Sequence, residues 1–230
     1  MVTAEKEDII NEYKAFIGAA AFPCIAAKAA LSRQQVNCFV TGSMYCPHFD
    51  KAILDFLYQF TDQLRASEDM YHSAAIIFTD LFPEDEAAFD QLLWQRLQSL
   101  SDLDAKNYGY DKRVSADPTA ADFSFSLKGE AYYIIGLHPN SSRRARSFKY
   151  PVLVFNSHAQ FEALRETTKY DQMKKVVRKR DTLYSGSVNP MLEDFGTGSE
   201  VFQYSGREYP AGWECPLKIH HAGNTDHSAA

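Results

Sequence analysis

The chain has 230 residues, of which 45% are hydrophobic and 23% charged, an ordinary composition for a globular protein with a sizeable core. Its formal net charge of -6 argues against a nucleic-acid-binding protein, and its longest apolar stretch, 15–27, is too short to span a bilayer. The charged N-terminus lacks the order of a secretory signal, and the four scattered cysteines form no C-x-x-C pair. We therefore expect a cytoplasmic protein with reduced thiols that binds neither nucleic acid nor membrane.

Hydrophobic spacing, prolines and turn residues predict alternating helices and strands. In chain order these are a helix at 5–18, a helix from Pro23 to about Ser32, a strand at 37–41, a helix at 48–66, a strand at 74–79, a helix opened by Phe82-Pro83, strands at 123–127 and 131–137, a strand at 152–156, and a helix from Ser157 to about Arg180.

These elements predict an α/β fold of the α+β type, with a single mixed, largely antiparallel sheet covered by helices. Lys128-Gly129-Glu130 between two of the strands predicts a β-hairpin. Since no repeat or linker marks a second unit, we expect one domain over 1–216 and a flexible tail over 217–230. That tail would hold three histidines: His220, His221 and His227.

Cys24 follows a Phe-Pro pair at the head of an alanine-rich run, FPCIAAKAAL. Because proline favours the first turn of a helix, Pro23 would place Cys24 in that turn, beside unpaired backbone N–H groups. The positive end of the helix dipole lowers a thiol's pKa there and favours the thiolate, which a nucleophile or a metal ligand requires. Free cysteine is also often buried, so a structural role for Cys24 is the alternative.

Two other segments combine residues suited to binding. The segment 138–149, HPNSSRRARSFK, leaves a predicted strand and holds four basic residues: Arg143, Arg144, Arg146 and Lys149. Arginines at a strand end are well placed to bind carboxylates, although a solvated charged surface is the alternative. The segment 185–207 is rich in Gly, Asn-Pro and small hydroxyl residues with interleaved apolar ones, which is typical of a functional loop that packs.

Several motifs occur in the order found in the YqcI/YcgG family. They are FPCIAAKAAL, AIIFTD with QLLWQRLQSL, DFSFSLKGEAYYIIGLHPNSSRRARSF, and VVRKRDTLYSGSVNPMLEDFG with QYSGR and WECP. Over roughly Phe22 to Pro216 the chain resembles this family, most of all the branch typified by the guanitoxin-pathway haem-dependent N-hydroxylase. The resemblance implies a monooxygenase that uses dioxygen to hydroxylate a guanidine or amine nitrogen of a small arginine-like substrate.

The resemblance also implies haem as the cofactor, with the Cys24 thiolate as ligand to the iron. The haem b would be non-covalent, because the sequence has no C-x-x-C-H attachment motif. Electrons would come from a separate donor protein, since no flavin or nicotinamide fingerprint is present. Cys215, in GWECP, is the alternative ligand.

Haem carries two propionates that need cationic partners when buried. Arg143 and Arg146 are the preferred partners, with Arg144 next and Lys28, one helical turn after Cys24, as a further choice. His138 has three interpretations: a hydrogen-bond donor on the distal side of the haem, a competing axial ligand, or an ordinary histidine at a strand end.

A guanidinium substrate would require a carboxylate that accepts it in bidentate fashion. Glu200 is the principal candidate, and Glu193 and Asp194 lie in the same long segment. Arg207 is the candidate for holding the carboxylate of an amino-acid substrate.

Two other functions are compatible with these residues. One is a non-catalytic haem-binding or haem-sensing protein, in which the same cysteine would hold iron without turnover. The other is a cofactor-free cysteine enzyme with Cys24 as nucleophile and a histidine as base, although no sequence feature pairs a histidine with Cys24.

Overall fold

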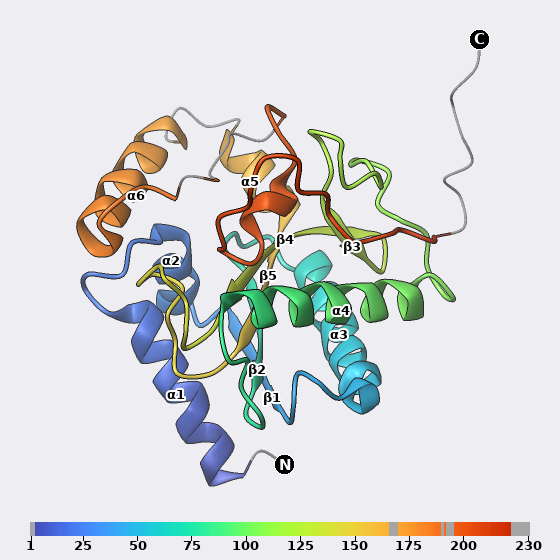
Figure 1. Ribbon diagram of the computed structural model, residues 1–230, viewed down its shortest axis with the longest axis horizontal. Helices are drawn as coiled ribbons and strands as arrows, with labels where there is room; N and C mark the ends of the chain where they lie inside the picture. The colour runs from blue at the N-terminus through green and yellow to red at the C-terminus, as the bar shows by residue number, and fades with distance from the viewer. Residues whose placement is uncertain (1–2, 166–169, 190, 192–195, 222–230) are drawn as a thin grey trace.

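A computed structural model describes residues 3–165, 170–189, 191 and 196–221. Its central feature is a five-stranded sheet of order β1-β2-β5-β4-β3, with helices on both faces (Figure 1). The strands are β1 Val36–Thr41, β2 Ser73–Phe78, β3 Phe125–Leu127, β4 Glu130–Leu137 and β5 Val152–Ser157. β1 and β2 are parallel and every other pair is antiparallel, so the predicted mixed, largely antiparallel sheet is confirmed.

The helices agree with the predicted positions except at the start of the fourth helix and in the region after β5. They are α1 Ala4–Gly18, α2 Ile25–Ser32, α3 Asp50–Ala66, α4 Glu86–Asp104, α5 His158–Arg165 and α6 Tyr170–Ser185, with short 3-10 helices η1 Pro47–Phe49 and η2 Glu200–Gln203. α4 begins later than the Phe-Pro pair because Asp85 is its N-cap and accepts a hydrogen bond from the Ala88 N–H. The single helix predicted over 157–180 is two helices, α5 and α6.

The predicted β-hairpin is formed by β3 and β4. Its two turn residues, Lys128 and Gly129, both have positive φ, at 54° and 65°. This is the backbone of a type I′ turn, whose twist matches that of two paired strands. The turn places Leu127 opposite Glu130 and sets the register of the whole pair.

Each face of the sheet has its own core because successive side chains along a strand point to opposite faces. Ile134 of β4 belongs to the larger core, under α3 and α4, whereas Leu137 belongs to the core under α1 and α2. α4 lies very close to the sheet: a Cβ built on Gly136 would be 2.6 Å from the Phe89 ring. The strand alternation therefore decides which side chains can share a site.

The packed part of the chain continues beyond Pro216, past the boundary expected for a tail. Leu217 is 3% exposed, and the buried His221 ring lies 2.9 Å from Asp104 Oδ2 through its Nε2. Two hydrogen bonds between Gln98 and the backbone of Lys218 tie this segment along α4. The last predicted tail histidine, His227, lies outside the described residues.

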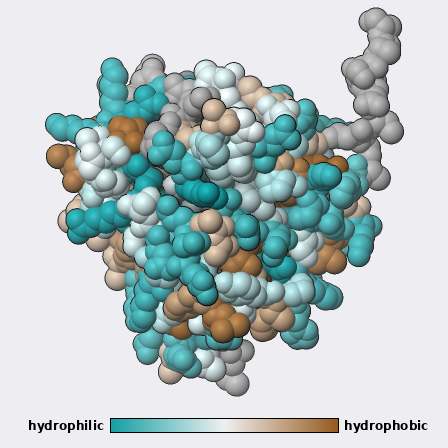
Figure 2. All heavy atoms as spheres, in the orientation of Figure 1, coloured by the Kyte–Doolittle hydropathy of each residue, from teal (hydrophilic) through white to brown (hydrophobic). Residues whose placement is uncertain are grey.

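The surface shown in Figure 2 has apolar atoms in small separate groups among hydrophilic ones. None of the helices in the described ranges has the length and apolar character needed to cross a bilayer.

Candidate functional site

The candidate site is a cavity of about 200 Å³ between the α1–α2 face of the sheet and helix α6. Figure 1 shows α6 beside α2, and the lining comes from both helices and from the strands beneath them. Most lining side chains are apolar, among them Ile17, Phe22, Ile135 and Val154. The thiol and charged groups on its wall are Cys24, Arg143, Arg146 and Asp181. A mainly apolar cavity with a few convergent polar groups is the usual form of a small-molecule site.

Cys24 is the N-cap of α2, so the helix begins at Ile25, two residues after the proline that was expected to open it. Its backbone is extended, and its Sγ accepts a hydrogen bond from the Ala27 N–H at 3.4 Å. The sulfur thus takes the place that a serine or aspartate oxygen takes in a common N-cap. The predicted location at the helix N-terminus is correct, and it leaves the half-buried thiol on the cavity wall.

The pKa of the Cys24 thiol is raised, whereas its place at a helix N-terminus predicts a lowered pKa. Burial raises the pKa above its ordinary value, and the backbone N–H groups of Ala27 and Ala26 and the charge of Arg146 lower it only in part. Desolvation disfavours the charged thiolate more than the helix end favours it. A cation bound at the sulfur would reverse that balance, because coordination to a metal deprotonates a thiol.

Arg146 is held rigidly at the cavity wall. Its Nη1 donates to the carbonyls of Gly136 at 2.9 Å and Tyr204 at 3.1 Å, and its Nη2 donates to the carbonyl of Gln203 at 2.9 Å. A guanidinium has five N–H donors, so donors beyond these three contacts are left for a ligand. Arg146 therefore joins β4 to the η2 segment and presents positive charge to Cys24.

Arg143 connects the same wall to α6. Its Nη2 lies 2.7 Å from Asp181 Oδ2 and donates to the Ser187 carbonyl at 2.9 Å. Both side chains of this ion pair are at most 14% exposed. The other carboxylate oxygen, Asp181 Oδ1, is buried and has no hydrogen-bond partner among the described residues. An orphaned acceptor on a cavity wall is suited to a ligand with N–H donors.

The other two predicted cations do not line the cavity. Arg144 is exposed and its guanidinium lies 4.6 Å from the ring centre of Tyr184. Lys28 is partly exposed and its Nζ donates to the Ala20 carbonyl at 2.8 Å. Of the four predicted propionate partners, Arg143 and Arg146 line the cavity.

His138 lies on the opposite face of the sheet from Cys24. Its neighbour Leu137 lines the cavity, whereas the His138 ring stacks on Phe89 of α4 at 4.3 Å between ring centres. The side chain is 1% exposed, and burial lowers its pKa to about 4, so the ring is neutral at physiological pH. The placement separates His138 from the Cys24 cavity, and its surroundings fit a histidine at a strand end.

Glu200 is also separated from the cavity. It lies in η2 under the larger core, where its Oε1 accepts hydrogen bonds from the Ser124 hydroxyl at 2.8 Å and from the Tyr204 hydroxyl. Burial raises its pKa to about 8. Glu200, the predicted substrate carboxylate, therefore does not line the Cys24 cavity, and Glu193 and Asp194 lie outside the described residues.

Cys215 and Arg207 likewise belong to the α4 side of the molecule. Cys215 packs on the larger core, and burial raises the pKa of its thiol to about 12. Arg207 Nη1 lies 3.7 Å from Asp90 Oδ2 of α4. Neither side chain lines the Cys24 cavity.

Asp181 is a charged cavity residue that the sequence did not reveal. It lies within the basic run KKVVRKRD, and a lone acid there reads as part of a solvated helix. Only the pairing of α6 with the 138–149 loop reveals its position.

Across the described ranges, no group of three or more His, Cys, Asp and Glu side chains could hold a metal ion, so any metal at Cys24 would depend on a cofactor for its other ligands.

Comparison with known proteins gives a family and two relatives. The model of the YqcI/YcgG family matches residues 13–218. Two Bacillus subtilis (strain 168) proteins, "Uncharacterized protein YqcI" and "Uncharacterized protein YcgG", are 28% and 27% identical to the chain over 184 residues. These matches cover 76% of this chain and 70% and 71% of the relatives. No solved structure gives a significant match.

Proposed function

The chain belongs to the YqcI/YcgG family, and from that premise we propose that it is a haem-dependent monooxygenase that hydroxylates a guanidine or amine nitrogen. The proposal takes its chemistry from the resemblance to the guanitoxin-pathway branch of the family. The observation that supports it in this chain is Cys24, which opens from the N-cap of α2 into an apolar cavity with two arginines on its wall.

The donor set of the cavity suits a haem. Cys24 supplies a soft sulfur ligand, and the apolar lining suits a flat macrocycle. Arg143 and Arg146 supply the cations that buried propionates require. Bound haem supplies dioxygen activation, which a thiolate ligand favours. With the iron bound, the Arg146 charge and the N–H groups at the helix N-cap would add to its charge in favouring the thiolate.

The cavity is too small to hold a haem without a change in its shape. Its volume of about 200 Å³ lies below the range of roughly 300–1,000 Å³ that drug-sized ligands occupy. Haem binding therefore requires one wall to move outward, and α6 is the wall that we propose moves. Its contacts include the Arg143–Asp181 ion pair. Arg180 Nη2 donates hydrogen bonds to the carbonyls of Ala20 and Phe22. The Tyr184 ring packs against Phe22 and the Arg144 guanidinium.

Asp181 replaces Glu200 as the proposed carboxylate for the substrate. It is the acid on the described cavity wall, and its Oδ1 has no hydrogen-bond partner there. A substrate guanidinium can donate to that oxygen and be held in one orientation. The reaction converts an N–H bond to N–OH, with one atom of dioxygen in the product and the other in water. The two electrons come from a separate donor protein, and solvent supplies two protons.

The test is the absorption spectrum of the purified protein after titration with haem. We expect stoichiometric binding, a thiolate-type spectrum of the reduced carbonyl complex, and a saturable spectral change on addition of arginine or agmatine. Substrate-dependent oxygen consumption with a chemical reductant would then separate an oxygenase from a haem-sensing protein. Failure to bind haem, or a spectrum perturbed by acids and never by guanidines, would contradict the proposal.

Replacement of Arg146 by methionine should weaken haem retention about tenfold or more. Methionine fills a similar volume but loses the charge that faces Cys24 and the propionates, and charge-assisted hydrogen bonds are worth about 1.5–3 kcal/mol each. The measurement is the rate of haem transfer to apomyoglobin. Arg33→Met is the control, because Arg33 is exposed and lies over the Tyr71 ring outside the cavity. Equal haem loss from both variants would show that Arg146 does not contribute to haem binding.

A further inference from the structure

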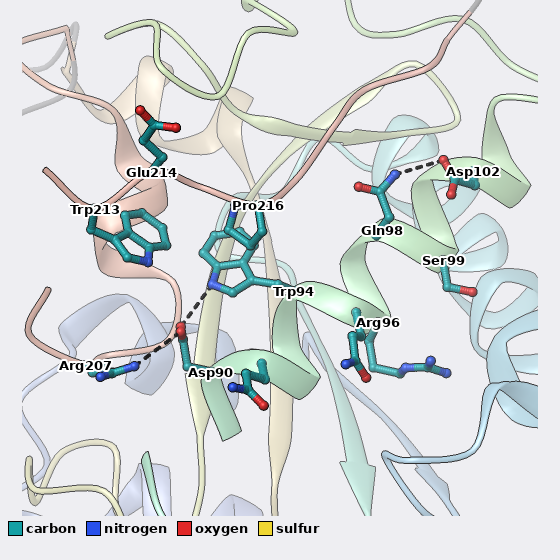
Figure 3. Close-up of a pocket in the computed structure, with 12 residues that line it drawn as sticks. Asp90, Trp94, Arg96, Gln98, Ser99, Asp102, Arg207, Trp213, Glu214 and Pro216 are labelled. Carbon is teal, nitrogen blue, oxygen red and sulfur yellow. Dashed lines mark hydrogen bonds and ion pairs between the residues drawn. The ribbon is translucent and has the colours of Figure 1, made fainter. Parts of the chain in front are cut away.

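Both tryptophans of the chain line a single groove beside α4, on the opposite side of the sheet from the Cys24 cavity. Its volume is about 840 Å³, within the range of roughly 300–1,000 Å³ of ligand pockets. α4 supplies Asp90, Trp94 and Asp102, and the segment after η2 supplies Arg207, Trp213 and Glu214 (Figure 3). The proposed oxygenase chemistry gives no role to this groove.

The aromatic side chains of the groove have fixed positions. Trp94 is 4% exposed and its Nε1–H donates to Asp90 Oδ1 at 2.9 Å. Trp213 is half-buried, with its ring centre 3.8 Å from that of Tyr209 in a stacked arrangement and 5.8 Å from that of Trp94. Figure 3 shows Trp213 of the C-terminal segment facing Trp94 of α4. Rigid aromatic walls give contact area at a small entropic cost.

The charges of the groove favour a cation. Three carboxylates line it, on Asp90, Asp102 and Glu214, against two arginines. The charge of Arg96 is already paired, because its Nη1 lies 2.6 Å from the buried Asp50 carboxylate. Arg207 is the remaining cation, and its side chain is 38% exposed.

Asp90 has one carboxylate oxygen that is incompletely matched. Oδ1 accepts hydrogen bonds from Trp94 and from the Tyr209 hydroxyl. Among the described residues, Oδ2 faces the Arg207 guanidinium at 3.7 Å, which is too long for a direct hydrogen bond. Asp90 is 5% exposed, so its charge is held in a poorly solvated position at the groove wall, where a cation with good geometry interacts strongly.

We propose that this groove binds a small organic cation, with an ammonium or guanidinium head at Asp90 Oδ2 and against the indole of Trp213. The ring quadrupole attracts a cation over an aromatic face, and Trp attracts it most. Arg207 occupies the same position as an internal guanidinium, and the ligand displaces its exposed side chain. The inference does not depend on haem binding or on the Cys24 cavity.

Intrinsic fluorescence tests the inference directly, because both tryptophans line the groove. The protein is titrated with choline, with agmatine, and with dimethylbutanol, the neutral carbon isostere of choline. We expect a saturable change in tryptophan emission with a cation and no saturable change with the neutral compound. Choline tests a quaternary ammonium head, and agmatine tests a guanidinium or primary ammonium head. An equal response to dimethylbutanol, or no saturable response to either cation, would overturn the inference.

Two variants with opposite expected effects identify the position of the cation. Asp90→Asn keeps an oxygen for Trp94 and Tyr209 but removes the charge, so affinity should fall about tenfold or more. Arg207→Gln removes the competing internal cation, so affinity should rise. Asp55→Asn is the matched control, since Asp55 is an exposed α3 residue paired with Lys51. If Asp90→Asn fails to fold, the Arg207→Gln variant tests the proposal alone. A higher affinity for the cation would support it, and an unchanged or lower affinity would overturn it.

Discussion

Replacement of Cys24 by alanine should abolish the thiolate-type spectrum of the reduced carbonyl complex, even where some haem is retained. The sulfur is the group proposed to ligate the iron, and alanine removes it while leaving the extended N-cap backbone accessible. The loss of the Ala27 N–H contact should cost about 1 kcal/mol of helix capping, too little to unfold the domain. The measurement is the absorption spectrum of the haem-loaded variant before and after reduction under carbon monoxide.

Cys38→Ala is the control for this experiment. Cys38 is also half-buried and packs against the core under α1 and α2, but it does not line the cavity. Its variant should keep the wild-type spectrum. A thiolate-type spectrum that persists in Cys24→Ala and disappears in Cys215→Ala would assign the ligand to Cys215 on the other side of the sheet and refute the proposed site.

Replacement of Glu200 by glutamine should change the pH dependence of stability and leave guanidine binding intact. Burial raises the folded-state pKa of Glu200 to about 8, whereas an unfolded glutamate titrates near about 4.3. Between these values the folded state holds a proton that the unfolded state releases. The free energy of unfolding therefore falls as pH rises through this window, and the stabilisation by the protonated group is lost above about pH 8.

Glutamine cannot ionise, but it retains an oxygen for the Ser124 and Tyr204 hydroxyls. Between pH 5 and pH 9 the wild type should lose stability relative to the variant by an amount on the order of 4 kcal/mol. Urea unfolding at a series of pH values measures this difference. Glu68→Gln, at an exposed position, should follow the wild type. Parallel curves for wild type and Glu200→Gln would show that the buried carboxyl does not titrate in this window.

The sequence by itself determined the features that depend on near neighbours. Lys128-Gly129 predicts the hairpin because the turn needs two residues that tolerate positive φ, and both adopt it. Pro23 predicts a helix start beside Cys24, and α2 begins at Ile25 with Cys24 as its N-cap. Apolar runs and alternation predict the strands, and the hairpin and the long helices between strands predict a mixed, largely antiparallel sheet. Each of these signals lies within a few residues of the feature that it specifies.

Only the tertiary structure decided which side chains share a site. Leu137 and His138 are adjacent in sequence but lie on opposite faces of the sheet, because the strand alternates. Asp181 reaches the Cys24 cavity through an ion pair with Arg143, and Trp94 meets Trp213 across the α4 groove. Pairings over such sequence separations come from packing, which no local pattern encodes. The pKa of Cys24 is another such property, since the helix end that lowers it is local but the burial that raises it comes from the whole fold.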